Sequence, residues 1–456
     1  SMAAFLPLFI CGLCTLLLLA ALCVSKSLKQ SSLNLPPGPF PLPVIVVLFL
    51  SPQISEKYGP VFTIHLGFQR TVVLTGYEAV KEALLNTADV FADRPAIPIF
   101  YHIQHGNELW KTTRRFTMAT MRDLGMGKRL AEERIQEEFG DEASGEPFRL
   151  RFLNTAPTNI TFAILFGRRF DYKDPTFVTL LRLIDEVMLL LGSPFLHVSC
   201  PLLKCFSILS DLVGQADFHC WTIFENLEVL PFPLVSQKEK DKSNTSFYDA
   251  NVLASALDLL MAGTETTSTT LQWAILLMMK YPEIQRKVHA EIEQVLGPSC
   301  LPTFEDRKNM PFTNAVIHEV QRFVTLLPHV PRCTSTDTYF KGYFIPKGTT
   351  VIPLLTSVLL DKTQWETPEE FNPNHFLDVD GNFVKKKAFL PFSTGRRNCV
   401  GESLATVELF IFFTGLMQKF TFKPQPGVKE SELDTTAEAG FTMRPHPQCA
   451  CAVPRE

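Results

Sequence analysis

The chain has 456 residues, 46% of them hydrophobic, so it can bury a large core and does not have the composition of a disordered protein. Its formal net charge of −4 gives no sign of a basic surface for nucleic acid. Of the eleven cysteines, Cys11, Cys14 and Cys23 lie in the apolar N-terminus and the others are scattered without a Cys-x-x-Cys pair, which argues against a disulfide framework and against a zinc site. The composition therefore indicates a folded, reduced protein that binds no nucleic acid.

The N-terminal segment 3–24 carries no charged side chain and is long enough to cross a bilayer as a helix. A cleaved signal peptide is the alternative, but the apolar run is long for one and no small-residue cleavage site follows it. Lys26 and Lys29 come next, and the positive-inside tendency then places the rest of the chain in the cytoplasm. We expect a transmembrane anchor at 3–24 and a basic, proline-rich linker at 25–43.

Beyond the linker, the pattern first predicts strands and then helices. Residues 61–67 and 70–76 are rich in β-branched side chains and read as two strands joined by a short turn. Residues 77–87 have the apolar spacing of a helix, and helical periodicity dominates residues 110–300.

Residues 251–281 form the longest apolar stretch in this part of the chain. We expect a helix buried through the centre of the domain. A second membrane span is the poorer interpretation, because a bilayer would penalise Asp258 and Glu265. After residue 330 the chain becomes irregular and strand-like, and no repeat or linker divides residues 35–456. The sequence thus predicts one α+β domain that is mostly α-helical.

Cys399 has a setting that is unusual for an inert buried cysteine. Gly395 and Arg397 precede it, Gly401 follows it, and residues 402–420 are predicted to form an apolar helix. A thiolate at a helix N-terminus is stabilised by the dipole and by free backbone N–H groups. Such a sulfur can be a nucleophile or an iron ligand. A nucleophile would need a general base, and no histidine lies near it in the sequence.

The order Phe392, Gly395, Arg397, Cys399, Gly401 resembles the cysteine-loop signature of the cytochrome P450 family, the haem-thiolate monooxygenases. The likeness covers nearly the whole chain and is closest to the microsomal family 2 enzymes of vertebrates. It implies the P450 fold with a small β-rich region, a catalytic domain at 44–456, and haem b whose iron is bound by the Cys399 thiolate.

Further motifs are assigned roles by the same resemblance. The expected partners of the haem propionates, which need charge-assisted donors when buried, are Trp110, Arg114, His329 and Arg397. Glu319 and Arg322 stand at i,i+3 on one helical face and are expected to tie their helix to the segment around His375.

The motif Ala-Gly-Thr-Glu-Thr-Thr at 262–267 resembles the oxygen-activation segment of the family. Ala262 and Gly263 are expected to leave room for dioxygen, Thr266 to hold a water, and Glu265 to relay protons inward. The substrate-pocket residues implied by the resemblance are Phe100, Met261, Ala262, Leu326, Leu327 and Val330.

The implied function is insertion of one oxygen atom from O2 into small lipophilic substrates such as xenobiotics, fatty acids or steroids. No Gly-rich dinucleotide fingerprint follows a strand, so electrons are expected from NADPH–cytochrome P450 reductase, with cytochrome b5 as a further partner. The expected location is the endoplasmic reticulum membrane, with the catalytic domain facing the cytoplasm. The basic residues that could form a docking face are Arg115, Arg122, Lys128 and Arg129.

Several connecting segments are shorter than the family pattern: 40–56, 100–110, 139–148 and 224–246. The haem-side motifs are intact, so a haem-binding but catalytically impaired splice form or pseudoenzyme is an alternative. A haem-thiolate isomerase or dehydratase that needs neither dioxygen nor reductase is another, although Glu265 and Thr266 argue against it. A cysteine hydrolase is the remotest.

Overall fold

The computed structural model describes residues 34–39, 51–66, 69–95, 114–115, 117–118, 147–192, 223, 249–298, 300–438 and 440–455. The predicted anchor at 3–24, Phe100 and Trp110 lie outside these ranges. Within them, no helix combines the length and apolarity that a membrane crossing requires.

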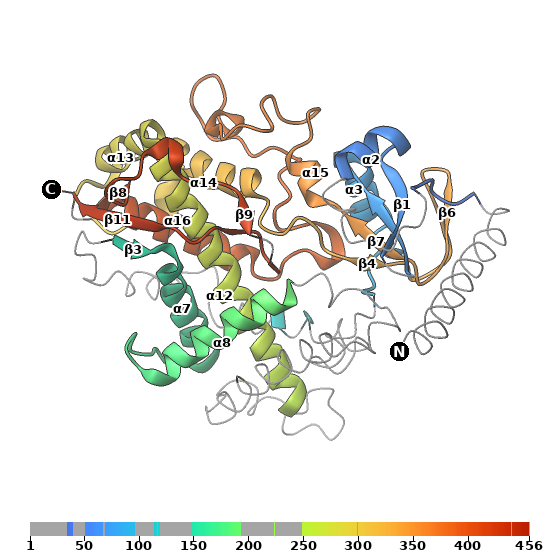
Figure 1. Cartoon of the computed structure of the whole chain (residues 1–456), viewed down its shortest axis with the longest axis horizontal. Coiled ribbons are helices and arrows are strands. Elements are labelled where there is room, and N and C mark those ends of the chain that lie inside the picture. The colour runs from blue at the N-terminus through green and yellow to red at the C-terminus, as the bar shows by residue number, and fades with distance from the viewer. Residues whose placement is uncertain are drawn as a thin grey trace, which may run out of the picture.

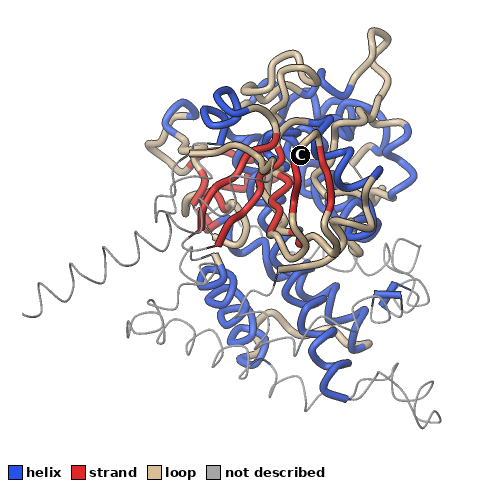
Figure 2. The backbone as a smooth tube through the Cα atoms, turned by 90° about the vertical axis from the view of Figure 1, so that its right-hand side faces the viewer, coloured by secondary structure: helices blue, strands red, loops and turns tan. Residues whose placement is uncertain are grey.

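The described chain is rich in helices, which spread over the whole molecule, whereas the strands are confined to parts of it (Figures 1 and 2). The α-helices are α2 (Ser51–Tyr58), α3 (Tyr77–Lys81), α7 (Thr155–Phe166), α8 (Pro175–Leu191), α12 (Asp249–Lys280), α13 (Pro282–Leu296), α14 (Pro311–Val324), α15 (Leu355–Leu359) and α16 (Glu402–Lys419). Short 3-10 turns lie at Leu150–Asn154, Phe304–Lys308, Pro373–Phe376, Gly395–Arg397 and Glu430–Glu432, and a π-helical turn at Glu82–Asn86. The predicted helix at 77–87 is therefore α3 followed by this π turn.

The strands are β1 (Val61–Leu66), β2 (Gln69–Leu74), β3 (Pro147–Arg149), β4 (Arg332–Cys333), β5 (Thr338–Phe340), β6 (Tyr343–Ile345), β7 (Thr350–Pro353), β8 (Phe420–Pro424), β9 (Ala437–Glu438), β10 (Arg444–Pro445) and β11 (Cys449–Pro454). The largest described sheet has the order β1-β2-β7-β4, in which β2 and β7 are parallel and the other pairs antiparallel. Strand β11 lies between β3 and β8, and β9 pairs with β10 and β5 with β6. The two strands predicted at 61–67 and 70–76 are β1 and β2.

Helix α12 runs through the middle of the molecule, as the apolar stretch at 251–281 predicts (Figure 1). Every residue from 271 to 279 is buried, which is the pattern of a helix enclosed on all sides. One end packs with α7 and α8 around Leu260 and Met261, and the other with α13, α14 and α16. Pro282 starts α13 directly afterwards, since proline is tolerated in the first helical turn and not in the interior. This central helix carries the predicted Ala-Gly-Thr-Glu-Thr-Thr motif.

Candidate functional site

Cys399 closes a tightly turned loop that leads into α16. After the turn at Gly395–Arg397, the backbone N–H of Cys399 donates to the carbonyl of Phe392 over 3.0 Å. Gly395 has a φ of 79°, and a Cβ there would lie 1.9 Å from the carbonyl oxygen of Leu84. Only glycine fits that conformation and that approach, so the signature glycine has a steric reason to be there.

The Cys399 thiol is suited to binding a metal rather than to acting as a free nucleophile. The residue keeps exposed surface, yet enough protein surrounds it that desolvation raises the pKa of the thiol. Hydrogen bonds from the backbone N–H groups of Gly401 and Glu402, and the charge of Arg114, partly oppose this rise. A thiol with a raised pKa is a poor nucleophile at neutral pH, whereas a coordinated metal ion removes its proton directly.

A group of four arginines, called here the arginine cluster, gathers beside the Cys399 loop from distant parts of the sequence: Arg94, Arg114, Arg332 and Arg397. The Arg114 Nη2 donates at 2.7 Å to both the backbone and the side-chain oxygen of Asn398, the residue before Cys399. The Arg397 Nε donates at 2.8 Å to the carbonyl of Ala92. These contacts fix the cluster against the cysteine loop.

The arginine cluster has an excess of buried positive charge. Burial, and then the charges of Arg94, Arg397 and Arg114, lower the pKa of Arg332 to about 8. Burial, and then the charges of Arg94 and Arg114, lower the pKa of Arg397 to about 9, with Asp93 opposing the shift. Cations that destabilise one another in this way form a site for anions, and paired carboxylates such as two propionates match it.

The sequence predicted only part of this cluster. Arg114 and Arg397 were expected there, but Arg94 and Arg332 were not. Arg332 begins β4 three residues after His329, whose backbone bridges to Leu354. The propionate role of His329 stays a prediction. A fully buried arginine in a segment without periodicity gives no local signal.

On α12, Ala262 is exposed and the Thr266 hydroxyl donates to its carbonyl over 2.8 Å. Gly263 serves helix packing, because a Cβ there would lie 2.7 Å from the Thr161 hydroxyl of α7. Gly263 therefore has a packing role on α12. Its predicted role in leaving room for dioxygen stays a prediction.

Glu265 is held by residues from the C-terminal part of the chain, and its proton-relay role stays a prediction. Both carboxylate oxygens accept hydrogen bonds from Arg444, at 2.7 and 2.6 Å, and Thr442 also donates to the carboxylate. Successive helical side chains diverge by about 100°, so Glu265 faces β10 while Thr266 turns back onto its own helix. The sequence missed Arg444 entirely.

The predicted structural trio is brought together where α14 meets the turn at Pro373–Phe376. Arg322 makes a bidentate ion pair with Glu319, with Nε and Nη2 each 2.7 Å from a carboxylate oxygen. The His375 ring lies 3.2 Å from both oxygens, and Arg322 also donates to the carbonyls of Pro368 and Glu370. Helix α14 is thus tied to the irregular segment that precedes the cysteine loop.

Of the predicted pocket residues that are described, Met261 and Ala262 lie on α12, and Leu326, Leu327 and Val330 lie in the segment after α14. Met261 belongs to the buried cluster of α7 and α8, against which Phe441 also packs. The Leu326 carbonyl accepts from the Met443 N–H at 2.9 Å, so the C-terminal hairpin reaches this region. Val330 packs against the core around the main sheet, and Leu327 is half-buried. Phe441 is a pocket candidate that the sequence did not single out.

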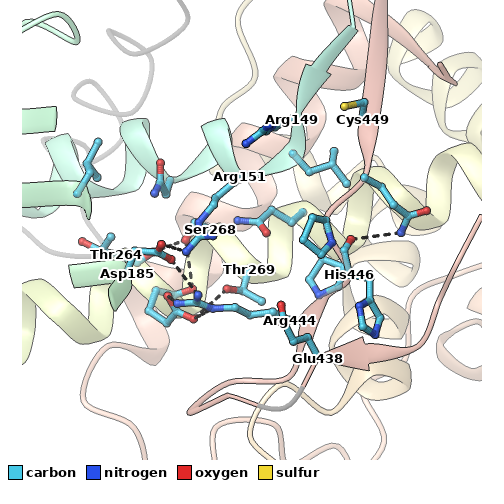
Figure 3. Close-up of a pocket in the computed structure, with 18 of the residues that line it drawn as sticks. Arg149, Arg151, Asp185, Thr264, Ser268, Thr269, Glu438, Arg444, His446 and Cys449 are labelled. Atoms are coloured by element: carbon cyan, nitrogen blue, oxygen red, sulfur yellow. Dashed lines mark hydrogen bonds and ion pairs between the residues drawn. The ribbon is translucent and has the colours of Figure 1, made fainter. Parts of the chain in front are cut away.

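A separate cavity of about 600 Å³ lies between α8, α12 and β10 (Figure 3). Its wall includes Asp185, Thr264, Glu265 and Arg444 but neither Cys399 nor the arginine cluster. It is therefore a feature of its own beside the cysteine site.

The cytochrome P450 family model matches residues 36–227 and 232–452. Cytochrome P450 2W1 of Homo sapiens is 49% identical, over 95% of this chain and 96% of the relative, and that of Mus musculus is 50% identical over 92% and 93%. Cytochrome P450 2K4 of Oncorhynchus mykiss is 41% identical over 97% and 96%.

The human alignment runs over 475 positions although only 95% of this chain takes part, so the relative has residues where this chain has none. This agrees with the shortened segments, and the family match breaks at 228–231, inside one of them. The chain belongs to the cytochrome P450 family and is a monooxygenase that uses haem with an axial cysteine thiolate.

Proposed function

We propose that this enzyme inserts one oxygen atom from dioxygen into small lipophilic compounds, such as xenobiotics, fatty acids or steroids. The observation that carries the proposal is the pairing of the Cys399 thiol with the arginine cluster. One supplies a metal ligand at a helix N-terminus, and the other supplies buried cations for two carboxylates. This donor set fits iron protoporphyrin IX, which has one iron and two propionates.

In this proposal Cys399 holds the iron, and Arg114, Arg332 and Arg397 hold the propionates, with Trp110 and His329 as predicted further partners. Haem bound through a thiolate supplies oxygen activation, because the sulfur donates electron density that favours O–O cleavage. Phe392, Gly395 and Gly401 keep the loop in its turned conformation. Together these residues would fix the orientation of the cofactor.

The protons are handled by α12. Thr266 is half-buried, and its hydroxyl keeps an acceptor lone pair for a water while it donates to Ala262. Glu265 is the nearest acid in the sequence and is proposed to supply protons to that water. Ala262, which is exposed, leaves space beside them. Met261, Leu326, Leu327, Val330 and Phe100 are proposed to surround the apolar substrate.

Electrons are proposed to come from NADPH through a separate reductase, with cytochrome b5 as a further partner. Lys385, Lys386 and Lys387 line a shallow recess beside Phe392 and Asn398, which supports a docking face for an acidic electron donor. Of the docking residues predicted from the sequence, Arg115 is exposed and the other three lie outside the described ranges. We also propose that the chain is anchored in the endoplasmic reticulum membrane by residues 3–24, with the catalytic domain in the cytoplasm.

The test combines a spectrum with turnover. The reduced, carbon monoxide-treated protein should show the thiolate-type difference spectrum, and Cys399→Ala should lose it while Cys300→Ala, at an exposed cysteine, keeps it. Oxidation of a lipophilic substrate panel should then require both NADPH and reductase. Full thiolate ligation in Cys399→Ala would contradict the proposal.

A catalytically impaired variant is the second candidate, favoured by the shortened segments. A thiolate-type spectrum in a protein that oxidises nothing across the panel would select it. Turnover that needs neither NADPH nor reductase would instead select a haem-thiolate isomerase or dehydratase.

A further inference from the structure

Arg444 binds the acid of the α12 motif from outside the helix. Its Nε and Nη2 donate to Oε1 and Oε2 of Glu265 at 2.7 and 2.6 Å, and both side chains are more than nine-tenths buried. Thr269 donates to the same Oε1 at 3.4 Å. A bidentate, buried arginine–carboxylate pair fixes the orientation of the carboxylate more tightly than a single contact can.

The pair is one half of a larger network. The Arg444 Nη1 donates at 2.8 Å to Asp185 on α8, which also forms an ion pair with Arg151 (Figure 3). Negative and positive groups therefore alternate from Glu265 through Arg444 and Asp185 to Arg151. Losing Arg444 would leave the buried carboxylate of Glu265 without its cation, and the half-buried Asp185 with Arg151 alone.

The Glu265 carboxylate also belongs to the wall of a cavity. Glu265 and Arg444 line the cavity of about 600 Å³, which has Ser268 and Gln272 in its wall. Thr264 also lines it, and its buried hydroxyl has no hydrogen-bond partner among the described residues. A polar cavity of this size holds water, which would satisfy that hydroxyl.

We infer that Arg444 is a positioning residue for proton delivery: it fixes the Glu265 carboxylate at the wall of this cavity, on the helix that also carries Thr266. This rests on the proposed function. Glu265 takes up a proton that the cavity water relays from bulk solvent, so that this water is left neutral. Glu265 then gives a proton to the water at Thr266 and is again the anion paired with Arg444. The net result is one proton moved inward with no change in the protein.

The experiment compares peroxide released per NADPH consumed in the reconstituted full-length enzyme. Arg444→Met removes the cation and should raise this ratio severalfold, while Arg444→Lys, which keeps a cation, should restore most of the coupling. In a Glu265→Gln background, Arg444→Met should add no further peroxide, because its effect passes through Glu265. Arg182→Met is the matched control, since it breaks an exposed ion pair with Glu186 on α8 and should leave the ratio unchanged.

Thermal melting followed by far-ultraviolet circular dichroism supplies a readout that does not depend on turnover. Loss of a buried pair's cation should lower the melting temperature by on the order of 3 °C or more. That fall should be smaller when Glu265→Gln is already present. If Arg444→Met does not fold, Arg444→Gln, which is neutral but keeps amide donors, replaces it with the same expectation for peroxide.

The outcomes separate the two claims. Wild-type turnover with an unchanged peroxide ratio in Arg444→Met, or effects that simply add in the double variant, would overturn the role of Arg444 alone. A wild-type protein without NADPH-dependent turnover would overturn the proposed function and this inference with it.

Discussion

Arg322 donates two hydrogen bonds to the carboxylate of Glu319, and neither side chain has any exposed surface. The remaining donors of Arg322 reach the carbonyls of Leu359, Pro368 and Glu370, so one guanidinium joins α14 to two other parts of the chain. We expect Arg322→Met to cost about 3–5 kcal/mol, because it leaves the carboxylate buried without its cation. Chemical or thermal unfolding, with haem content as a second readout, measures the loss.

Lys308 offers a matched control for Arg322. It pairs with Glu305 at the same i,i+3 spacing, but both side chains are exposed. Exposed pairs contribute about 1 kcal/mol or less, so Lys308→Met should leave stability and haem content nearly unchanged. Equal losses in the two variants would contradict the structural role of the buried pair.

The contrast between local and distant contacts explains what the sequence could predict. Spacing and composition reveal features that depend on residues close together in the chain. These are the Glu319–Arg322 pair, the turn before Cys399 and the central helix α12. The Arg444–Glu265 pair joins residues 179 positions apart, and Arg94 reaches Pro331 across 237 positions. A buried arginine on a short strand such as β4 or β10 has no periodic neighbours, so only the folded chain shows which acid or anion it meets.

The Cys399 loop should not tolerate a side chain at Gly395. A Cβ there meets the Leu84 carbonyl oxygen at 1.9 Å, and the φ of 79° is itself unfavourable for alanine. Gly395→Ala should therefore lose most thiolate-ligated haem, measured by the carbon monoxide difference spectrum. Gly427 has a φ of 90°, and no atom of the described residues lies within 4 Å of the position a Cβ would take, so Gly427→Ala isolates the backbone effect. Similar haem loss in both would show that the approach to Leu84 is unimportant.

Glu408 on α16 is a fully buried acid whose Oε2 accepts a hydrogen bond from Thr267 of α12 at 2.9 Å. Burial raises the pKa of this carboxyl to about 8, with the Thr267 hydrogen bond opposing the shift. The pKa of this carboxyl is higher in the folded protein than in the unfolded one. Below about pH 4.5 the carboxyl is protonated in both states and does not lower the free energy of unfolding. The cost to stability grows as pH rises from about 4.5 to about 8.

Glu408→Gln keeps an acceptor for Thr267 and cannot ionise. Its melting temperature should therefore gain on that of the wild type steadily between pH 5 and pH 8, by several degrees in total. Glu430→Gln, at an exposed glutamate, provides the comparison and should show no such trend. A difference that stays flat with pH for Glu408→Gln would mean that this carboxyl does not stay protonated in the fold.

Arg332 should act as a counter-ion for the cofactor. The side chain is 1% exposed, and burial together with three neighbouring arginines lowers its pKa to about 8. Arginine keeps its proton in proteins, so this shift marks a cation that lacks an anion rather than a neutral side chain. Arg332→Met should therefore relieve the repulsion among the arginines in the haem-free protein. It should also weaken the binding of the haem propionates.

Two measurements separate these effects. Removing one buried charge-assisted hydrogen bond corresponds to roughly tenfold faster haem dissociation. In the haem-free protein, an added organic dicarboxylate should raise the melting temperature of the wild type more than that of Arg332→Met. Arg396 is the exposed arginine next to Arg397 in the sequence and pairs with Asp89. Arg396→Met should alter neither result. If haem dissociates from Arg332→Met at the same rate as from the wild type, Arg332 does not bind the propionates. The other residues of the arginine cluster would then hold the cofactor without it.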